Sequence, residues 1–250
     1  MSISKPYYHI WRPVHDYDIS CILEKRDNTE YLYDKRYVNP EEFRSLANAA
    51  RLQTTDLNKL FMYIEPTEAN LSVYSQKIFE LFVRASIEFE ANCKVILKAN
   101  QYHNSGNWNI NDYNKINDAT KLSDYIVHFN ECAIPDIRPF KEWQSQNPLS
   151  WYQDYNSVKH NRSEFFSKAN LSNLFKAVAG LYCILHAQFG HRIASYISNN
   201  GMASICSDES IIENDFVVIQ TPLFTDEERY EFDWATLKEN DCAFDFYSFR

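Results

Sequence analysis

Apolar residues recur every three or four positions over residues 72–98, a stretch without glycine or proline. This period predicts a long amphipathic helix. The same period predicts a second helix over 171–198, in which Gly190 marks an end or a kink. The side chains expected to be buried between these helices are Phe82, Phe89, Leu174, Val178 and Leu185.

Three further helices are predicted. Residues 120–130 place Leu122 and Phe129 on one helical face, and residues 151–166 form a helix rich in aromatic residues. Residues 39–51 begin with Asn and Pro followed by two acids, which is typical of a helix start because Asn caps the first turn and Pro fits it.

Both ends of the chain have the composition of short strands. Residues 1–38 alternate β-branched and aromatic residues with charged ones and predict a small hairpin, and the last fifty residues predict a second β element. We expect these two ends to pair with each other. The predicted fold is mainly α, with an N-terminal extension over 1–64, a helical bundle over 65–200 and a C-terminal extension over 201–250.

The composition of the 250-residue chain is that of a globular protein, with 45% hydrophobic and 24% charged residues. A net charge of −9 argues against non-specific coating of nucleic acid. The six cysteines have no CxxC or metal-ligand spacing, so we predict neither a metal site nor another cofactor. No apolar run is long enough to cross a membrane. We therefore expect a cytoplasmic protein without a membrane partner.

The segment "SWYQDYNSVKHNRSEFF", residues 150–166, gathers polar chemistry beside aromatic rings. On a helix, Asn156 and His160 lie one turn apart. His160 could move a proton near neutral pH while Asn156 holds its tautomer or a phosphate oxygen. Lys159 or Arg162 could supply positive charge. A solvated helix face would explain the same residues without any chemistry.

Further positions of this segment complete the pattern. Trp151, Tyr155, Val158 and Arg162 follow one another at helical spacing and form a single stripe. Glu88 and Glu90 on the long helix could approach the polar cluster as acids. Residues two apart point to different faces of a helix, however, so their spacing favours solvated or salt-bridged carboxylates.

The order of the long helix with "RASIEFEANCK", the "YNSVKHNR" segment and a final apolar helix resembles the HEPN superfamily. Members of that family are small α-helical bundles, typically dimeric, and many are metal-independent ribonucleases of toxin–antitoxin and anti-phage systems. Their signature is Arg, a polar residue that is often Asn, three further residues and His. Asn156 and His160 match the last two positions, while Tyr155 stands where the family has Arg.

The resemblance implies a reaction in which the ribose 2′-OH attacks the adjacent phosphate. His160 would act as acid or base, Asn156 would orient it or the phosphate, and Lys159 and Arg162 would stabilise the negative charge. A homodimer would bring two such histidines together. The side chains that could stack on RNA bases, with core packing as the alternative, are Trp151, Tyr152 and Tyr155.

The first functional hypothesis is therefore a metal-independent endoribonuclease of toxin or anti-phage defence type. The alternative is a non-catalytic HEPN-like module that binds a nucleotide, RNA or a protein partner. A third class, an assembly or regulatory protein, is also open. The implied partners are RNA, a second copy of the chain, and an antitoxin or defence-system protein.

Overall fold

The computed structural model describes residues 3–15, 28–198, 200–205 and 211–249. The protein is mainly helical, with one small antiparallel sheet. Its α-helices are α2 (Pro40–Phe61), α3 (Gln76–Ala99), α4 (Ile110–Asn114), α5 (Ile116–Thr120), α6 (Ser150–His160), α7 (Arg162–Phe165), α8 (Leu171–Phe189) and α9 (Trp234–Leu237). The strands are β1 (Ile126–Phe129), β2 (Ala203–Ile205), β3 (Ile211–Asn214) and β4 (Val217–Gln220). Among the 3-10 turns are η1 (Asn28–Tyr33), η3 (Leu122–Asp124) and η5 (Phe166–Lys168).

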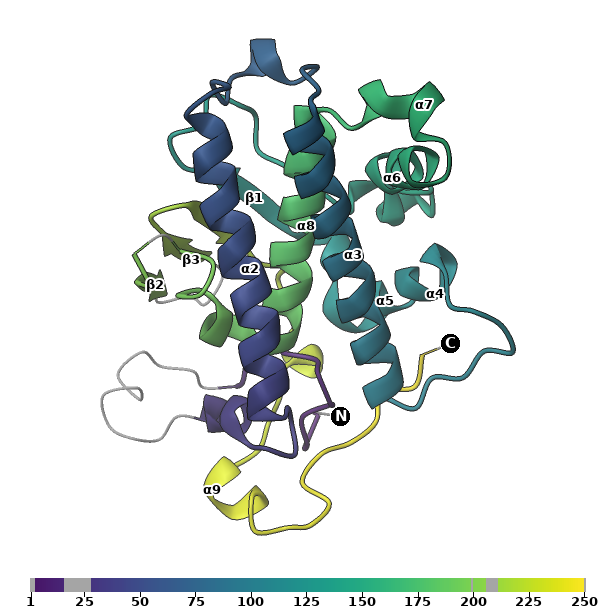
Figure 1. Ribbon diagram of the computed structural model, residues 1–250. Coiled ribbons are helices and arrows are strands. Elements are labelled where there is room, and N and C mark those ends of the chain that lie inside the picture. The colour runs from purple at the N-terminus through teal and green to yellow at the C-terminus, as the bar shows by residue number, and fades with distance from the viewer. Residues whose placement is uncertain (1–2, 16–27, 199, 206–210, 250) are drawn as a thin grey trace.

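Helices α2, α3 and α8 run side by side and form the centre of the fold (Figure 1). In α8 every residue is buried except Ser172 and Lys176, so this helix is the middle of the core. The sheet packs against it through Phe129, whose ring lies 4.9 Å from that of Phe175 between centroids. Helices α6 and α7 lie on the other side of the bundle (Figure 1).

The two long helices confirm the predictions from periodicity. All five side chains expected in the core have no more than 1% of their surface exposed. Each helix is also capped at its start, since Ser75 Oγ accepts from the Ile78 amide at 3.2 Å and Asn170 Oδ1 accepts from the Asn173 amide at 3.0 Å. Local sequence and core packing therefore favour the same two helices.

Helix α8 ends at Gly190, which has a φ of +53°. The indole of Trp11 packs directly on this residue, and a β-carbon there would lie 2.5 Å from the ring. Glycine is needed at this position for both the backbone conformation and the close contact. The helix predicted over 171–198 is therefore shorter than expected and stops at the glycine.

The prediction of a helix over 120–130 is wrong. Lys121 has a φ of +53°, residues 122–124 form only the 3-10 turn η3, and the chain is extended after them. Residues 126–129 form β1, which pairs antiparallel with β4, and the sheet order is β1-β4-β3-β2. Val127 and Phe129 are buried on one face of the strand, while His128 between them is exposed. In so short a segment, helical and alternating spacing select overlapping residues, and strand pairing decides between them.

Two other boundaries differ from expectation. Helix α2 continues to Phe61 instead of ending near Arg51, since no glycine or proline interrupts it and Asp56 forms ion pairs with Lys59 and Arg84. In the predicted N-terminal hairpin, the part over 28–33 is the 3-10 turn η1 instead of a strand. Its other half, at 18–25, lies outside the described residues.

The two ends of the chain do pair. Parallel bridges join Ile3 and Val14 to Tyr230, and another joins Tyr7 to Asp245. Arg12, which is 6% exposed, strengthens this junction because its guanidinium donates to the carbonyls of Ala119 and Glu228. Among the described helices, none is both long enough and apolar enough to span a membrane.

Candidate functional site

Helix α6 carries the polar cluster and packs against α3 and α8. Its buried side is the predicted stripe of Trp151, Tyr155 and Val158, each with no more than 1% of its surface exposed. The Trp151 indole donates to the Pro139 carbonyl at 2.8 Å, which satisfies its polar atom in the core. This stripe fixes which residues of α6 face solvent.

The prediction of one helix over 151–166 is wrong, because α6 ends at His160. Asn161 has a φ of −143° and a ψ of 72°, which is outside the helical region, and α7 begins at Arg162. Arg162 therefore leaves the buried stripe of α6 and projects from a different helix. The break also places His160 in the last turn of α6, where it is exposed.

Asn156 and His160, which the sequence pattern predicted as the HEPN-like pair, are accessible in the structure. They lie one helical turn apart, Asn156 half-buried and His160 exposed. Neither side chain forms a hydrogen bond with another residue in the part of the chain that the structure describes. Both can therefore meet a ligand or a second protein molecule without first breaking an internal contact.

Tyr155, which stands at the family's arginine position, is fully buried. Its hydroxyl lies near Lys159 and Glu90, and burial is the main reason that its pKa is raised. A neutral, enclosed phenol cannot contact a phosphate in the way that an exposed guanidinium does. At the position where the HEPN signature has a cationic arginine, this chain has Tyr155, which packs in the core.

Lys159 belongs to a cluster centred on Glu90 of α3. Its ammonium lies 3.9 Å from Glu90 Oε1, and the same oxygen accepts a hydrogen bond from the Tyr152 hydroxyl at 2.7 Å. Contact with the Tyr155 hydroxyl and then the charge of Glu90 raise the pKa of Lys159. Glu90 thus approaches α6, as the sequence allowed, but it contacts Tyr152 and Lys159 and forms no bond with His160 or Arg162.

Arg162 is held by aromatic rings. Its guanidinium carbon lies 4.9 Å from the ring centre of Phe79 and 4.7 Å from that of Phe166, and it donates a hydrogen bond to Gln76 Oε1. No carboxylate among the described residues neutralises it. The side chain is exposed, so its positive charge remains open to solvent.

The rings proposed to stack on RNA bases lie in the core. Trp151 and Tyr155 have no exposed surface, and Tyr152 has 5%. These rings therefore pack in the core, which was the alternative to stacking on bases. A more exposed group of rings was not predicted from the sequence. Tyr74, half of whose surface is exposed, and Phe79 both contact Phe166 beside Arg162. The segment "SEFF", residues 163–166, follows Arg162 and was the local sign of rings at this place. Tyr74 and Phe79 come from a distant part of the sequence, so their presence there could not be read from it.

Two buried histidines have structural roles. The ring of His186 shares a hydrogen bond of 2.8 Å with the Tyr125 hydroxyl, and burial lowers its pKa to about 3. His9 contacts Gln188 at 3.2 Å, and burial lowers its pKa to about 4. Both rings are therefore neutral near pH 7. In the described part of the chain, histidine, cysteine and acidic side chains do not gather in threes that could hold a metal ion.

Comparison of the chain with family models, with curated proteins and with solved structures gives no match. The resemblance to the HEPN superfamily therefore stays a prediction that rests on the "YNSVKHNR" segment and the order of helices.

Proposed function

We propose that this protein is a HEPN-like module that binds RNA along the α6–α7 edge and that a single copy does not cleave it. The edge consists of Asn156, Lys159, His160 and Arg162. It combines two cationic side chains and two hydrogen-bonding groups with the neighbouring ring of Tyr74. Cations that meet phosphates and rings that stack on bases are the usual means of binding single-stranded RNA.

One observation carries the non-catalytic part of the proposal, namely the burial of Tyr155. Phosphoryl-transfer chemistry requires positive charge placed at the reacting phosphate. Of the two nearby cations, Lys159 is engaged with Glu90, and Arg162 belongs to the next helix and lies against the rings of Phe79 and Phe166. The edge therefore supports contact with RNA better than it supports the transition state of cleavage.

Cleavage is the second candidate, favoured by the availability of Asn156 and His160. Because one α6 offers a single histidine, an acid and a base would both be present only in a two-fold homodimer. In that case the ribonuclease would belong to the toxin or defence type, and an antitoxin or defence-system protein would be a natural partner. The two candidates differ in whether His160 is needed for turnover or only for binding.

The test measures binding and cleavage on the same samples. Fluorescence anisotropy with a labelled single-stranded RNA should show binding that Arg162→Ala weakens about tenfold, a typical loss for one stacked or phosphate-bound side chain. Arg44→Ala on the exposed side of α2 is the matched control and should bind like wild type. Denaturing gels with chelator present should show intact RNA.

Two outcomes would change the assignment. Cleavage that persists in chelator, disappears in His160→Ala and follows a dimer in light scattering would establish the ribonuclease instead. Absence of binding to single-stranded RNA at low salt would exclude both candidates and leave an assembly or regulatory role.

A further inference from the structure

A cavity of about 210 Å³ lies between the start of α8 and the loop that follows β1. Its apolar walls come from Leu71, Ile134, Pro135, Ile137 and Phe175. Its polar lining consists of Ser172 and Lys176 from α8 and of Asp136 and Arg138 from the loop. It is separate from the α6–α7 edge, since none of its lining residues belongs to that edge.

The walls of the cavity are held in place by backbone hydrogen bonds. Val127 and Ile137 exchange two such bonds of 2.8 Å, and the Ala133 amide donates to the Pro66 carbonyl at 2.9 Å. The opposite wall is fixed where the Ser172 amide donates to the Leu71 carbonyl at 2.9 Å. The cavity is therefore preformed, and a ligand would lose little free energy in ordering it.

Lys176 gives the cavity its chemical character. Ser172 and Lys176 are the only residues of α8 that are not buried, and they lie one turn apart on the side that lines the cavity. The Lys176 ammonium has neither an ion pair nor a hydrogen bond within the described residues. An uncompensated ammonium beside an apolar pocket suits a ligand with one negative charge and an apolar body.

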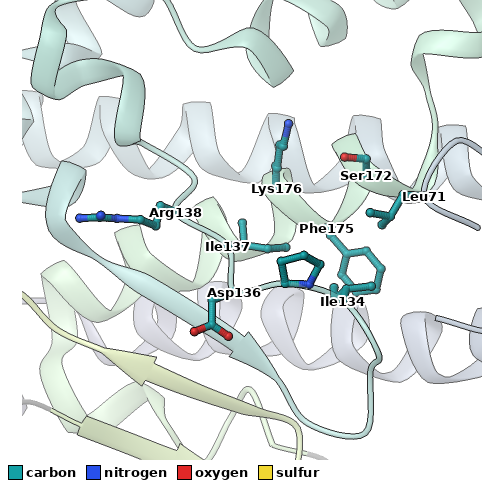
Figure 2. A pocket seen from close by; sticks show the side chains of 9 residues that line it. Leu71, Ile134, Asp136, Ile137, Arg138, Ser172, Phe175 and Lys176 are labelled. Carbon is teal, nitrogen blue, oxygen red and sulfur yellow. The ribbon is translucent and has the colours of Figure 1, made fainter. Parts of the chain in front are cut away.

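The two charged loop residues do not occupy the cavity. Figure 2 shows the Asp136 carboxylate and the Arg138 guanidinium directed away from the space between Ile137 and Phe175, and it shows Lys176 rising from the edge of that space with its ammonium on the outer side. Asp136 is engaged by His128, whose Nδ1 lies 2.8 Å from its carboxylate. The cavity thus keeps an apolar interior with Lys176 at its rim.

We infer that this cavity binds a small aromatic carboxylate, with the ring against Ile134 and Ile137 and the carboxylate on Lys176 and the Ser172 hydroxyl. An apolar cavity of about 150 Å³ is known to accept benzene. A volume of 210 Å³ therefore admits one ring with a short acidic substituent. The reasoning is independent of the RNA-binding proposal.

Benzoate and phenylacetate are the probes, and methyl NMR is the first measurement. The methyl resonances of Leu71, Ile134 and Ile137 should shift on titration with either acid, while those of Ile78 in the core should not. Benzylamine and benzyl alcohol, which have the same ring without the negative charge, should bind at least tenfold more weakly.

Variants test the assignment of the charge. Lys176→Gln should weaken benzoate binding about tenfold, because a hydrogen bond to a charged group commonly contributes that much. Lys176→Arg keeps the positive charge and should retain most of the wild-type affinity. Lys98→Gln, which removes an exposed lysine from α3, should bind like wild type. No methyl shift in wild type with millimolar benzoate would overturn the inference, as would equal binding of benzoate and benzylamine.

Discussion

The hydroxyl of Tyr152 on α6 donates a hydrogen bond to the Glu90 carboxylate on α3, with 2.7 Å between the two oxygens. This contact joins α6 to α3 and adds to the buried stripe of Trp151, Tyr155 and Val158, which turns Asn156 and His160 outward. Tyr152 is almost fully buried and Glu90 partly so, which makes the bond stronger than one on the surface.

Tyr152→Phe should therefore lower the free energy of unfolding by about 1–2 kcal/mol, because it leaves a carboxylate with one partner fewer. Urea denaturation gives the value, and a double-mutant cycle with Glu90→Ala, which removes the acceptor, should show positive coupling between the two residues. Tyr63→Phe is the control, since the Tyr63 side chain is 85% exposed and its loss should change little. Zero coupling would show that the two side chains act independently.

Tyr155→Arg should destabilise the protein instead of creating a nuclease. The new guanidinium would replace a fully buried ring, and an imperfectly compensated buried charge costs about 3 kcal/mol or more. Tyr155→Phe, which keeps the ring and removes only the hydroxyl, should remain within about 1 kcal/mol of wild type. A stable Tyr155→Arg protein that cleaves RNA would contradict this view and support a weakened ribonuclease.

Gly190→Ala should lower the free energy of unfolding by about 3 kcal/mol or more, since it combines a strained positive φ with a clash against Trp11. Thermal and urea unfolding measure the effect. Gly106→Ala is a matched control, because a β-carbon there would meet no atom within 4 Å. Equal stability of the two variants would mean that Trp11 does not pack on the end of α8.

His186 should make the protein less stable in acid. Its pKa is about 3 in the folded protein against 6.5 ordinarily, so below pH 6.5 the unfolded chain binds a proton that the folded one does not. The neutral ring makes its full contribution to the free energy of unfolding above pH 6.5. As the pH falls from 6.5 toward 3, that free energy decreases by about 1.4 kcal/mol per pH unit.

Urea denaturation of wild type and His186→Gln between pH 7.5 and pH 4.5 measures this effect. Over the acidic half of that range, the free energy of unfolding of His186→Gln should fall less steeply than that of wild type, by about 1.4 kcal/mol per pH unit. Val178→Ala destabilises the same helix without removing a titrating group and should keep the wild-type slope. Parallel slopes for wild type and His186→Gln would show that the ring is protonated in the folded state.

The sequence was sufficient for the features that depend on one helix. The long helices and their buried side chains follow from local periodicity, and so does the spacing of Asn156 and His160 on α6. The buried stripe of Trp151 and Tyr155 was also visible in the pattern, although the pattern alone did not exclude stacking on bases.

The features that depend on distant residues could not be predicted. Helix α6 ends at Asn161 because of a backbone conformation that no glycine or proline in the segment indicates. The contact between Tyr152 and Glu90 joins two helices that are separate in sequence, and so does the contact of Arg162 with Phe79. The cavity beside Lys176 requires the path of a loop, which periodicity does not describe.

The register of the sheet has a consequence for synthesis of the protein. Within the sheet, strand β1 pairs with β4, Ile126 opposite Gln220, and its other edge forms a bridge at Ile137, whereas β2, β3 and β4 follow one another along the chain. On the ribosome, α2, α3 and β1 emerge well before the strand that completes the ladder. The edge of β1 that faces β4 therefore stays unpaired while α8 is made, and such an interval is when a chaperone would be expected to engage the nascent chain.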